Sequence, residues 1–217
     1  METRYSGNME KYGLIILAAG SSNRLGRPKQ LLQFRKKSLL RHIIDEAIAT
    51  GYPVVLVIGA NGDLISREFN NTPVSIVENK GWEQGMGTSI RKGLEGMLAL
   101  FPDLDGVLFL ADDQPFVSSA MLNALMAQKK ASGKGIIACG YAHTSGIPVM
   151  FGKRYFSALL ALQGAAGAKK ILQEYGDDLL IVPFPLGEMD IDTAEDYDRL
   201  LKKNWPDDGR PEEQIYG

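Results

Sequence analysis

Cysteine, histidine and long apolar runs are scarce in this chain, and each scarcity excludes a class of protein. The 217 residues include one cysteine, Cys139, which excludes an internal disulfide framework and suits a reducing cytoplasm. Two histidines, His42 and His143, leave little room for a zinc site, although magnesium held by carboxylates stays open. No apolar run reaches the about 18 residues of a membrane span, and the polar N-terminus lacks the apolar core of a signal peptide.

Charge is nearly balanced over the whole chain but unevenly distributed along it. The formal net charge of −2 argues against nucleic-acid binding. Residues 11–44 contain no acidic residue, although basic residues stand at positions 11, 24, 27, 29, 35, 36, 37 and 41. A local basic stretch near a loop predicts a small polyanionic ligand rather than a polymer.

Short β-branched runs alternate with longer helical stretches through the first two thirds of the chain. We expect strands at residues 14–18, 53–58, 74–77, 107–111 and 135–139. We expect helices at residues 38–50, 62–69, 88–100 and 118–130. This alternation predicts βαβ crossovers, and therefore a three-layer α/β sandwich with a mostly parallel sheet.

The rhythm changes after Gly140. The remaining pattern predicts an extended insert at one edge of the sheet at residues 143–151, followed by helical structure at 155–173. It then predicts a last strand at 179–183 and a final helix at 193–203. No internal repeat or linker divides the chain. We expect one domain over residues 11–204, with flexible termini at 1–10 and 205–217.

The loop after the first strand contains the most informative residues. The small side chains at 18–22 would let backbone N–H groups approach an anion, and Arg24 and Lys29 would add positive charge. A glycine turn with solvated basic side chains explains the same residues equally well. Neither G-x-G-x-x-G nor G-x-x-x-x-G-K-[ST] occurs in this loop, which disfavours dinucleotide-binding and P-loop folds.

Two pairs of aspartates are candidate magnesium ligands. Asp112 and Asp113 follow an apolar strand, where open α/β sheets bind ligands, although acids also commonly end strands and cap helices. Adjacent strand residues point to opposite faces, so we expect only one of them to bind an ion. Asp190 and Asp192 lie two residues apart and share a face of an extended segment. Thr193 or Asp192 would cap the final helix, and we assign the cap to Asp192 and a metal role to Asp190.

Four segments in order resemble one known family. Residues 17–29 fit the pattern L-x-x-G-x-S-x-R-x-G-x-x-K of nucleotidyltransferases of the molybdenum cofactor type. Residues 79–89 are similar to the family's N-x-x-W-x-x-G-M-x-x-S, residues 113–115 to its D-x-P, and residues 190–196 to its D-I-D-T-x-E-D. Molybdenum cofactor cytidylyltransferases and guanylyltransferase-like relatives are the nearest match. The resemblance covers about residues 13–201 and implies a Rossmann-like sheet of the nucleotide-diphospho-sugar transferase type.

The resemblance also implies a reaction and a site. The family moves a nucleotide from an NTP, here CTP, to a phosphorylated acceptor such as molybdopterin, with Mg²⁺ as cofactor. Catalytic roles fall on Arg24, Lys29 and Asp113, and Asp113 with Asp190 would hold the metal. The implied nucleotide-binding residues are Leu17, Ala18, Ala19, Gly20, Lys29, Asn79, Gly85, Met86, Gly87 and Ser89. The last four of these would open a helix with bare N–H groups, which suit contacts to a ribose or a base.

Two departures from the family's motifs affect which substrates we expect. The family's G-D-x-G-A-R is replaced by Gly-Ala-Ala-Gly-Ala-Lys at residues 164–169, so Ala165 and Lys169 remove a carboxylate and a guanidinium from the expected acceptor site. Ala19 stands where guanylyl-transferring relatives carry glycine, which favours CTP because a methyl group narrows the space for a base. Two alternatives stay open: a nucleotide-binding chaperone that delivers cofactor to a molybdenum hydroxylase, and a sugar-phosphate nucleotidyltransferase.

Overall fold

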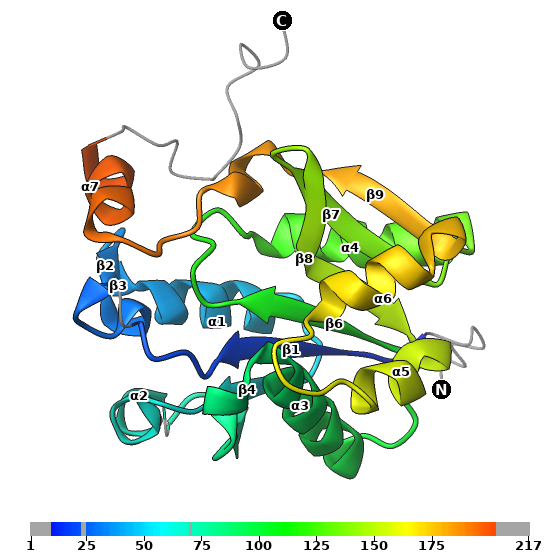
Figure 1. The fold of residues 1–217 in the computed structure, drawn as a ribbon, viewed down its shortest axis with the longest axis horizontal. Coiled ribbons are helices and arrows are strands. Elements are labelled where there is room, and N and C mark those ends of the chain that lie inside the picture. Colours follow the sequence, from blue (N-terminus) through cyan, green and yellow to red (C-terminus); the bar gives the residue numbers. More distant parts are fainter. Residues whose placement is uncertain (1–9, 23–24, 70, 203–217) are drawn as a thin grey trace, which may run out of the picture.

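The computed structural model describes residues 10–22, 25–69 and 71–202, which are built around one seven-stranded sheet (Figure 1). In chain order the strands of this sheet are β1 (Tyr12–Ala18), β4 (Val54–Ile58), β5 (Ser75–Glu78), β6 (Gly106–Ala111), β7 (Ile136–Tyr141), β8 (Thr144–Gly152) and β9 (Leu179–Pro183). Across the sheet their order is β5-β4-β1-β6-β8-β7-β9. A separate short hairpin is formed by β2 (Gln33–Phe34) and β3 (Lys37–Ser38).

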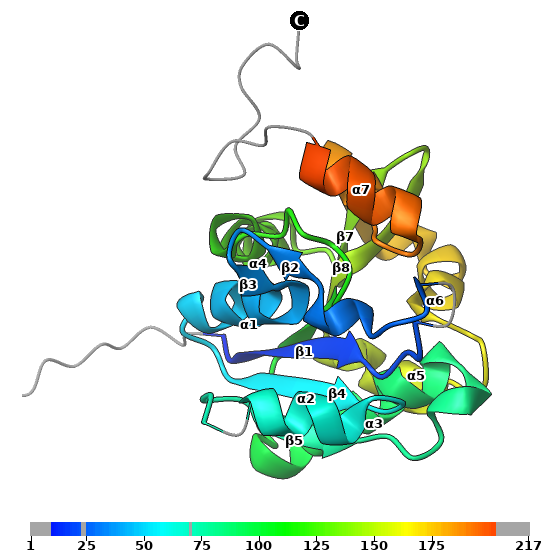
Figure 2. The ribbon, with the colours of Figure 1, turned by 90° about the vertical axis from the view of Figure 1, so that its left-hand side faces the viewer.

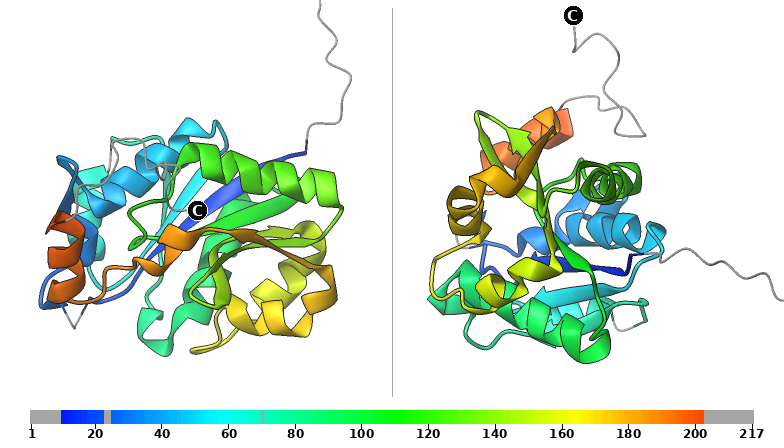
Figure 3. Two further views of the ribbon diagram at one scale, coloured as in Figure 1. Left: turned by 90° about the horizontal axis from the view of Figure 1, so that it is seen from above. Right: turned by 90° about the vertical axis from the view of Figure 1, so that its right-hand side faces the viewer.

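Helices cover both faces of the sheet. They are α1 (Leu39–Ala49), α2 (Gly62–Phe69), α3 (Met86–Leu100), α4 (Ser119–Ser132), α5 (Phe156–Leu160), α6 (Ala168–Glu174) and α7 (Ala194–Lys202). The first strand shows why both faces are needed, because Leu14 and Ile16 enter one core while Ile15 and Leu17 enter the other. Helices α1, α2 and α4 pack on the first side and α3, α5 and α6 on the second (Figure 3). The expected three-layer α/β sandwich is confirmed.

Four of the six strand pairings in the sheet are parallel, and both exceptions involve β8. Strands β1, β4, β5 and β6 pair in parallel, as do β7 and β9. Strand β8 runs antiparallel to both of its neighbours, β6 and β7. The segment at 143–151 was expected at one edge, and that expectation is wrong, because β8 lies inside the sheet. A tight hairpin from β7 returns the chain antiparallel, so β8 separates β7 from β6.

Local capping chemistry sets several helix ends as the sequence predicts. The Ser38 side chain accepts a hydrogen bond from the backbone N–H of Arg41, and Ser118 does the same for Met121. Gly133 ends α4 in the left-handed conformation, with φ of 68°. The expected helical stretch at 155–173 is not continuous, because residues 161–167 leave helical structure between α5 and α6.

The parallel strands end at one side of the molecule, which Figure 2 views directly. From β1 the chain crosses to β4 and β5 on one side, and then returns to β6 on the other side of β1. Such a reversal opens a crevice at the carboxyl ends of the strands, where open α/β sheets bind ligands. The loops that follow β1 and β6 both lie at this end of the sheet, and the segment before α7 crosses the same end (Figures 1 and 2).

Candidate active site

The ammonium group of Lys29 lies among carboxylates from two distant segments. Its Nζ atom is 2.6 Å from Oδ2 of Asp113, 3.4 Å from Oδ1 of Asp192 and 3.8 Å from Oδ1 of Asp112. Lys29 begins a short 3₁₀ turn after the first loop, whereas the two adjacent aspartates follow β6. Two of the three predicted catalytic residues, Lys29 and Asp113, are therefore in direct contact. The third, Arg24, lies outside the described residues.

Burial and charge act against each other in this cluster. The side chains of Lys29 and Asp112 are 13% and 7% exposed. Burial by itself would lower the pKa of Lys29, but the charges of Asp112, Asp113 and Asp192 outweigh it and raise that pKa. Burial raises the pKa of Asp112, and the positive charge of Lys29 opposes the rise. Lys29 is therefore held as a cation at physiological pH.

Asp112 reaches this cluster against expectation. The alternation of strand residues predicts that Asp112 and Asp113 face opposite sides, yet both carboxylates lie within 4 Å of the Lys29 ammonium. The reason is that β6 ends at Ala111, so the two aspartates belong to the following turn and not to the pleated strand. The Oδ2 atom of Asp112 is buried and accepts no hydrogen bond from the described residues.

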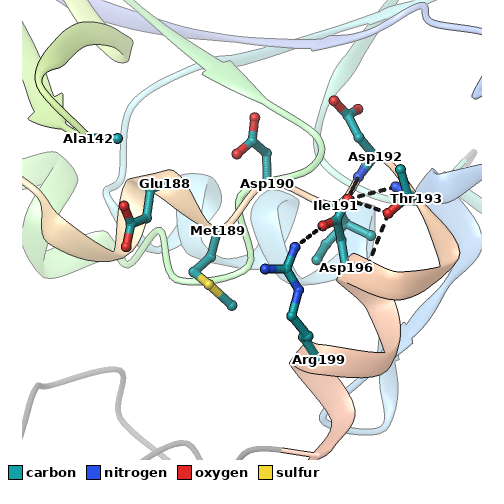
Figure 4. Close-up of a pocket in the computed structure, with 9 residues that line it drawn as sticks. All are labelled: Ala142, Glu188, Met189, Asp190, Ile191, Asp192, Thr193, Asp196 and Arg199. Carbon is teal, nitrogen blue, oxygen red and sulfur yellow. Dashed lines mark hydrogen bonds and ion pairs between the residues drawn. The ribbon is translucent and has the colours of Figure 1, made fainter.

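The segment before α7 is tied to the loop after β6. The backbone N–H of Ile191 donates to the carbonyl oxygen of Asp113 at 3.1 Å. This bond places Asp190 and Asp192 on either side of a residue that touches Asp113. Partial burial and the charges of Asp113 and Asp192 raise the pKa of Asp190. Figure 4 shows the side chains of Asp190 and Asp192 directed away from α7, as the two-residue spacing predicts.

The assignment of Asp192 to the helix cap is wrong. Helix α7 is capped by Thr193, whose Oγ1 accepts a hydrogen bond from the backbone N–H of Asp196 at 3.2 Å. The Asp196 carboxylate accepts in return from the backbone N–H of Thr193 at 2.8 Å, which makes a reciprocal capping box. Because Thr193 and Asp196 satisfy the helix end between them, the Asp192 side chain can face Lys29.

A pocket of about 500 Å³ opens beside this segment (Figure 4). Its charged lining comprises Glu188, Asp190, Asp192, Asp196 and Arg199. Arg199 is already paired with Asp196. Asp192 lines this pocket and also contacts Lys29, so the pocket adjoins the Lys29 cluster.

The start of α3 is closed by another loop. We expected bare N–H groups at residues 85–89, but the backbone N–H of Gly87 donates to the carbonyl oxygen of Gly164 at 3.0 Å. The backbone N–H of Thr88 donates to Gly85 at 3.1 Å. A Cβ on Gly85 would lie 2.6 Å from the Gly164 oxygen, and one on Gly87 would lie 2.7 Å from the Ala166 oxygen. Both glycines are thus required by the close approach of residues 164–166. The expectation of bare N–H groups is wrong at Gly87 and also at Gly85, whose backbone N–H donates to the carbonyl oxygen of Trp82 at 3.0 Å.

The polar side chains near α3 also form hydrogen bonds within the protein. Asn79 is 2% exposed, and its amide donates to Oγ1 of Thr88 and to Oγ of Ser89, both at 2.9 Å. Its carbonyl oxygen accepts from the backbone N–H of Gly81 at 3.0 Å. Met86 differs from these neighbours, because it is 50% exposed at the first turn of the helix. Of the predicted nucleotide-binding residues in this region, Met86 therefore presents the most side chain to a ligand.

The first loop combines buried and exposed positions. The predicted residues Leu17, Ala18 and Ala19 are all buried, and Gly20 is exposed. The Ala19 methyl group lies beside Gly59, where an added Cβ would meet it at 2.9 Å. Ala19 can therefore affect a bound base chiefly through the path of the loop backbone. A direct methyl contact would require more exposure than its 5%.

Two glutamines at the site were missed by the sequence reasoning. Gln30 is fully buried, and its amide donates to the carbonyl oxygens of Gly20 at 3.2 Å and Ala18 at 3.5 Å. Gln114 donates to the carbonyl oxygens of Ile147 at 3.0 Å and Gly187 at 3.2 Å. Each glutamine directly follows a predicted catalytic residue, Lys29 or Asp113, and this adjacency is the signal that could have found them.

The donor set fits a divalent cation completed by a substrate. Among residues 10–22, 25–69 and 71–202, no three His, Cys, Asp or Glu side chains are arranged to hold a metal ion by themselves. In phosphate-transfer sites Mg²⁺ is commonly held by one or two carboxylates together with substrate phosphates. The predicted ligands Asp113 and Asp190 can supply such carboxylates, and the ammonium of Lys29 already marks a position that attracts positive charge.

Comparison with known proteins identifies the family. The model of the MobA-like NTP transferase domain matches residues 14–179. This chain belongs to the MobA-like NTP transferase family. It is accordingly a nucleotidyltransferase, which uses a nucleoside triphosphate and an acceptor. The predicted family is thereby confirmed, and the motif at residues 190–196 lies beyond the matched residues.

Two relatives of this chain have different names. Nicotine blue oxidoreductase of Paenarthrobacter nicotinovorans is 29% identical over 199 residues, which cover 86% of this chain and 95% of that protein. Purine catabolism protein PucB of Bacillus subtilis (strain 168) is 27% identical over 203 residues, which cover 87% and 95% of the two chains. Because these names differ, the acceptor of this chain has to be inferred from its own site.

A solved structure supports the fold. Rv0371c of Mycobacterium tuberculosis H37Rv superposes with a TM-score of 0.77 at 30% identity, covering 89% of this chain and 98% of that one. A second structure of Rv0371c is a complex with manganese, with a TM-score of 0.73, 27% identity and coverage of 89% and 100%.

Within the part of the present chain that is described, no helix has the length and apolarity needed to cross a membrane.

Proposed function

We propose that this transferase moves the CMP group of CTP to a phosphate of a molybdopterin-type acceptor, with release of pyrophosphate. The observation that carries the proposal is the contact between Lys29 and Asp113 at the crevice where the sheet order reverses. These two residues come from separate family motifs, 84 positions apart in the chain. We assign the transferase domain to residues 11–204.

The chemistry of the proposed step needs little from histidine or cysteine. An oxygen of the acceptor phosphate would attack the α-phosphorus of CTP, and the bond from the α-phosphorus to the β-phosphate oxygen would break. The acceptor is already an anion, so no side chain has to remove a proton from it. The task of the protein is to align the two phosphates and to offset their charge.

We assign these tasks to residues at the crevice. Lys29 and Arg24 would hold the triphosphate and stabilise the charge that grows on the α-phosphate. Asp113 with Asp190 would hold Mg²⁺, which offsets charge on the phosphate oxygens when it is bound. The manganese complex of Rv0371c supports a divalent cation in this role. The exposed Gly20 and Met86 are the proposed residues with most contact to the nucleotide.

The altered motif at residues 164–169 favours a second candidate acceptor, a sugar phosphate. Ala165 and Lys169 replace the family's aspartate and arginine, so a fixed carboxylate and a bidentate fork are missing. We expect weaker use of molybdopterin cofactor than in relatives that keep both residues. Turnover with this cofactor should rise in an Ala165→Asp, Lys169→Arg variant, and no gain would remove the motif from the choice of acceptor.

Acceptor screening by pyrophosphate release tests the proposal. CTP, GTP and ATP are each offered with molybdopterin cofactor and with a set of sugar phosphates, in the presence of Mg²⁺ or Mn²⁺. Release with CTP and the cofactor supports the proposed function, and release only with sugar phosphates supports the second candidate. A nucleotide-dependent complex with a molybdenum hydroxylase, formed without pyrophosphate release, would contradict both and indicate a delivery chaperone.

A further inference from the structure

The position of Lys29 has a consequence for cation binding. Its ammonium is within 4 Å of three carboxylates, those of Asp112, Asp113 and Asp192. These side chains come from the turn after β6 and from the segment before α7, so the ammonium links two otherwise separate parts of the crevice. The closest contact, 2.6 Å to Oδ2 of Asp113, is short enough for a strong charge-assisted hydrogen bond.

A divalent cation at Asp113 would need the same oxygen atoms. Magnesium binds carboxylate oxygens at about 2.0–2.1 Å and requires near-octahedral space around itself. An ammonium in contact with the same carboxylate fills part of that space and repels the ion, because both carry positive charge in a partly buried site. Lys29 and a divalent cation therefore compete for Asp113 and its neighbours.

We propose that Lys29 and the divalent cation occupy this carboxylate cluster in turn, so that cation binding releases Lys29 toward the phosphates of the nucleotide. The inference rests on the proposed function in one respect only, the presence of a divalent cation at Asp113. The lysine is suited to such an exchange. Its charge sits at the end of four flexible methylene groups, so the ammonium can move while the backbone stays fixed. The backbone N–H of Lys29 remains anchored to Oγ of Ser22 at 3.1 Å.

The exchange also couples the binding of the nucleotide to the binding of the cation. A lysine that stays on Asp113 has its charge already balanced and contributes little to holding a triphosphate. Once the cation takes over the carboxylates, the positive charges of both the cation and Lys29 are available to phosphate oxygens. Nucleotide and cation are therefore expected to increase each other's affinity by the same factor, as linkage requires.

Manganese binding without nucleotide provides the first test. We expect Lys29→Met to bind Mn²⁺ at least about tenfold more tightly than the unaltered chain, measured by titration calorimetry or by the electron paramagnetic resonance signal of free Mn²⁺. Lys37→Met is the matched control, because Lys37 also lies 2.6 Å from a carboxylate, that of Asp45, at a separate surface site. Its Mn²⁺ affinity should stay unchanged. Adding Asp113→Asn to Lys29→Met should abolish the gain.

Chemical labelling of the unaltered chain provides a test that needs no variant to fold. Acetylation of Lys29, followed by mass spectrometry with Lys37 as the internal reference, should accelerate severalfold when Mn²⁺ is added. An unchanged or slower rate, or an Mn²⁺ affinity in Lys29→Met no tighter than in the unaltered chain, would overturn the exchange.

Pyrophosphate release on the same preparations separates the two proposals. Cation-dependent release without any change in Lys29 labelling overturns the exchange and leaves the transfer reaction standing. Faster labelling and tighter Mn²⁺ binding without release from any nucleotide and acceptor pair would support the exchange and contradict the proposed substrates.

Discussion

Two regions of the crevice contain family motifs, but the motif residues have different roles in the two regions. Around Lys29 the motif residues are charged, partly buried and in contact across long sequence separations. Around the start of α3 the motif residues are glycines and small polar side chains whose hydrogen bonds are made within the protein. The first region can exchange partners with a ligand, whereas the second is a closed support. Motif membership alone therefore does not distinguish chemistry from architecture.

Energetics explain the difference between the regions. A buried carboxylate oxygen without a partner, such as Oδ2 of Asp112, leaves binding capacity in the first region. Close backbone contact between residues 164–166 and the glycines of α3 leaves no space for a side chain in the second. Substitutions in the first region should therefore alter turnover, and those in the second should alter stability.

The largest expected effect is on turnover in the first region. Asp113→Asn should lower kcat by about 10²–10³-fold, the range seen when a preorganised electrostatic group is lost. The substitution keeps the shape of the side chain but removes the charge that faces Lys29 at 2.6 Å. Steady-state kinetics of pyrophosphate release would measure the loss.

Asp112→Asn is the matched control for this prediction. Asp112 lies farther from the ammonium, at 3.8 Å, and we expect its loss to lower kcat less than about tenfold. Equal losses in the two variants would show that the assignment of the metal role to Asp113 is wrong.

Gly85→Ala should produce the largest loss of stability in the second region. Gly85 has φ of 114°, and a Cβ would lie 2.6 Å from the carbonyl oxygen of Gly164. Backbone strain and overpacking together should lower the free energy of unfolding by about 2–5 kcal/mol. Urea unfolding would measure it, with Gly176→Ala as the control.

The control is chosen for its surroundings. An added Cβ on Gly176 would meet nothing within 4 Å, and its φ is not in the left-handed region. The free energy of unfolding of the Gly176→Ala variant should differ from that of the unaltered chain by less than about 0.5 kcal/mol. If Gly85→Ala is equally mild, residues 164–166 do not pack on α3 as described.

Asn79→Ala should be less destabilising. It removes a buried amide that makes hydrogen bonds to Thr88, Ser89 and Gly81, and about 1–3 kcal/mol of stability should be lost. Assayed well below its melting temperature, the variant should keep most of its kcat/KM for CTP. A drop of more than about tenfold in kcat/KM with unchanged stability would instead place Asn79 in contact with the nucleotide.

The smallest expected effect is on the choice of base. Ala19→Gly should narrow the preference for CTP over GTP by less than about tenfold, because Ala19 is 5% exposed and acts through the loop backbone. Measured kcat/KM values for CTP, GTP and ATP would decide. A preference of the unaltered chain for GTP would contradict the proposed donor.

Sequence patterns predicted the elements of this fold because the forces that specify them are local. The short apolar run at residues 14–18 predicted the strand that became β1, and Ser38, Ser118 and Thr193 were each placed near the start of a helix. The order of the motifs also predicted the family. None of these inferences requires knowing which distant segments touch.

Tertiary structure decided the features that depend on such contacts. Strand β8 entered the middle of the sheet because its pairing energy is shared between two neighbours, which no local pattern records. Asp192 was freed for Lys29 only because Asp196 and Thr193 satisfy each other, and Lys29 and Asp192 are 163 residues apart. The hydrogen bond from the backbone N–H of Gly87 to the carbonyl oxygen of Gly164 likewise joins two segments that are distant in the sequence. Composition and spacing thus determined which groups this protein has available, and chain packing determined which of them meet, because the energy of a contact depends on distance in space.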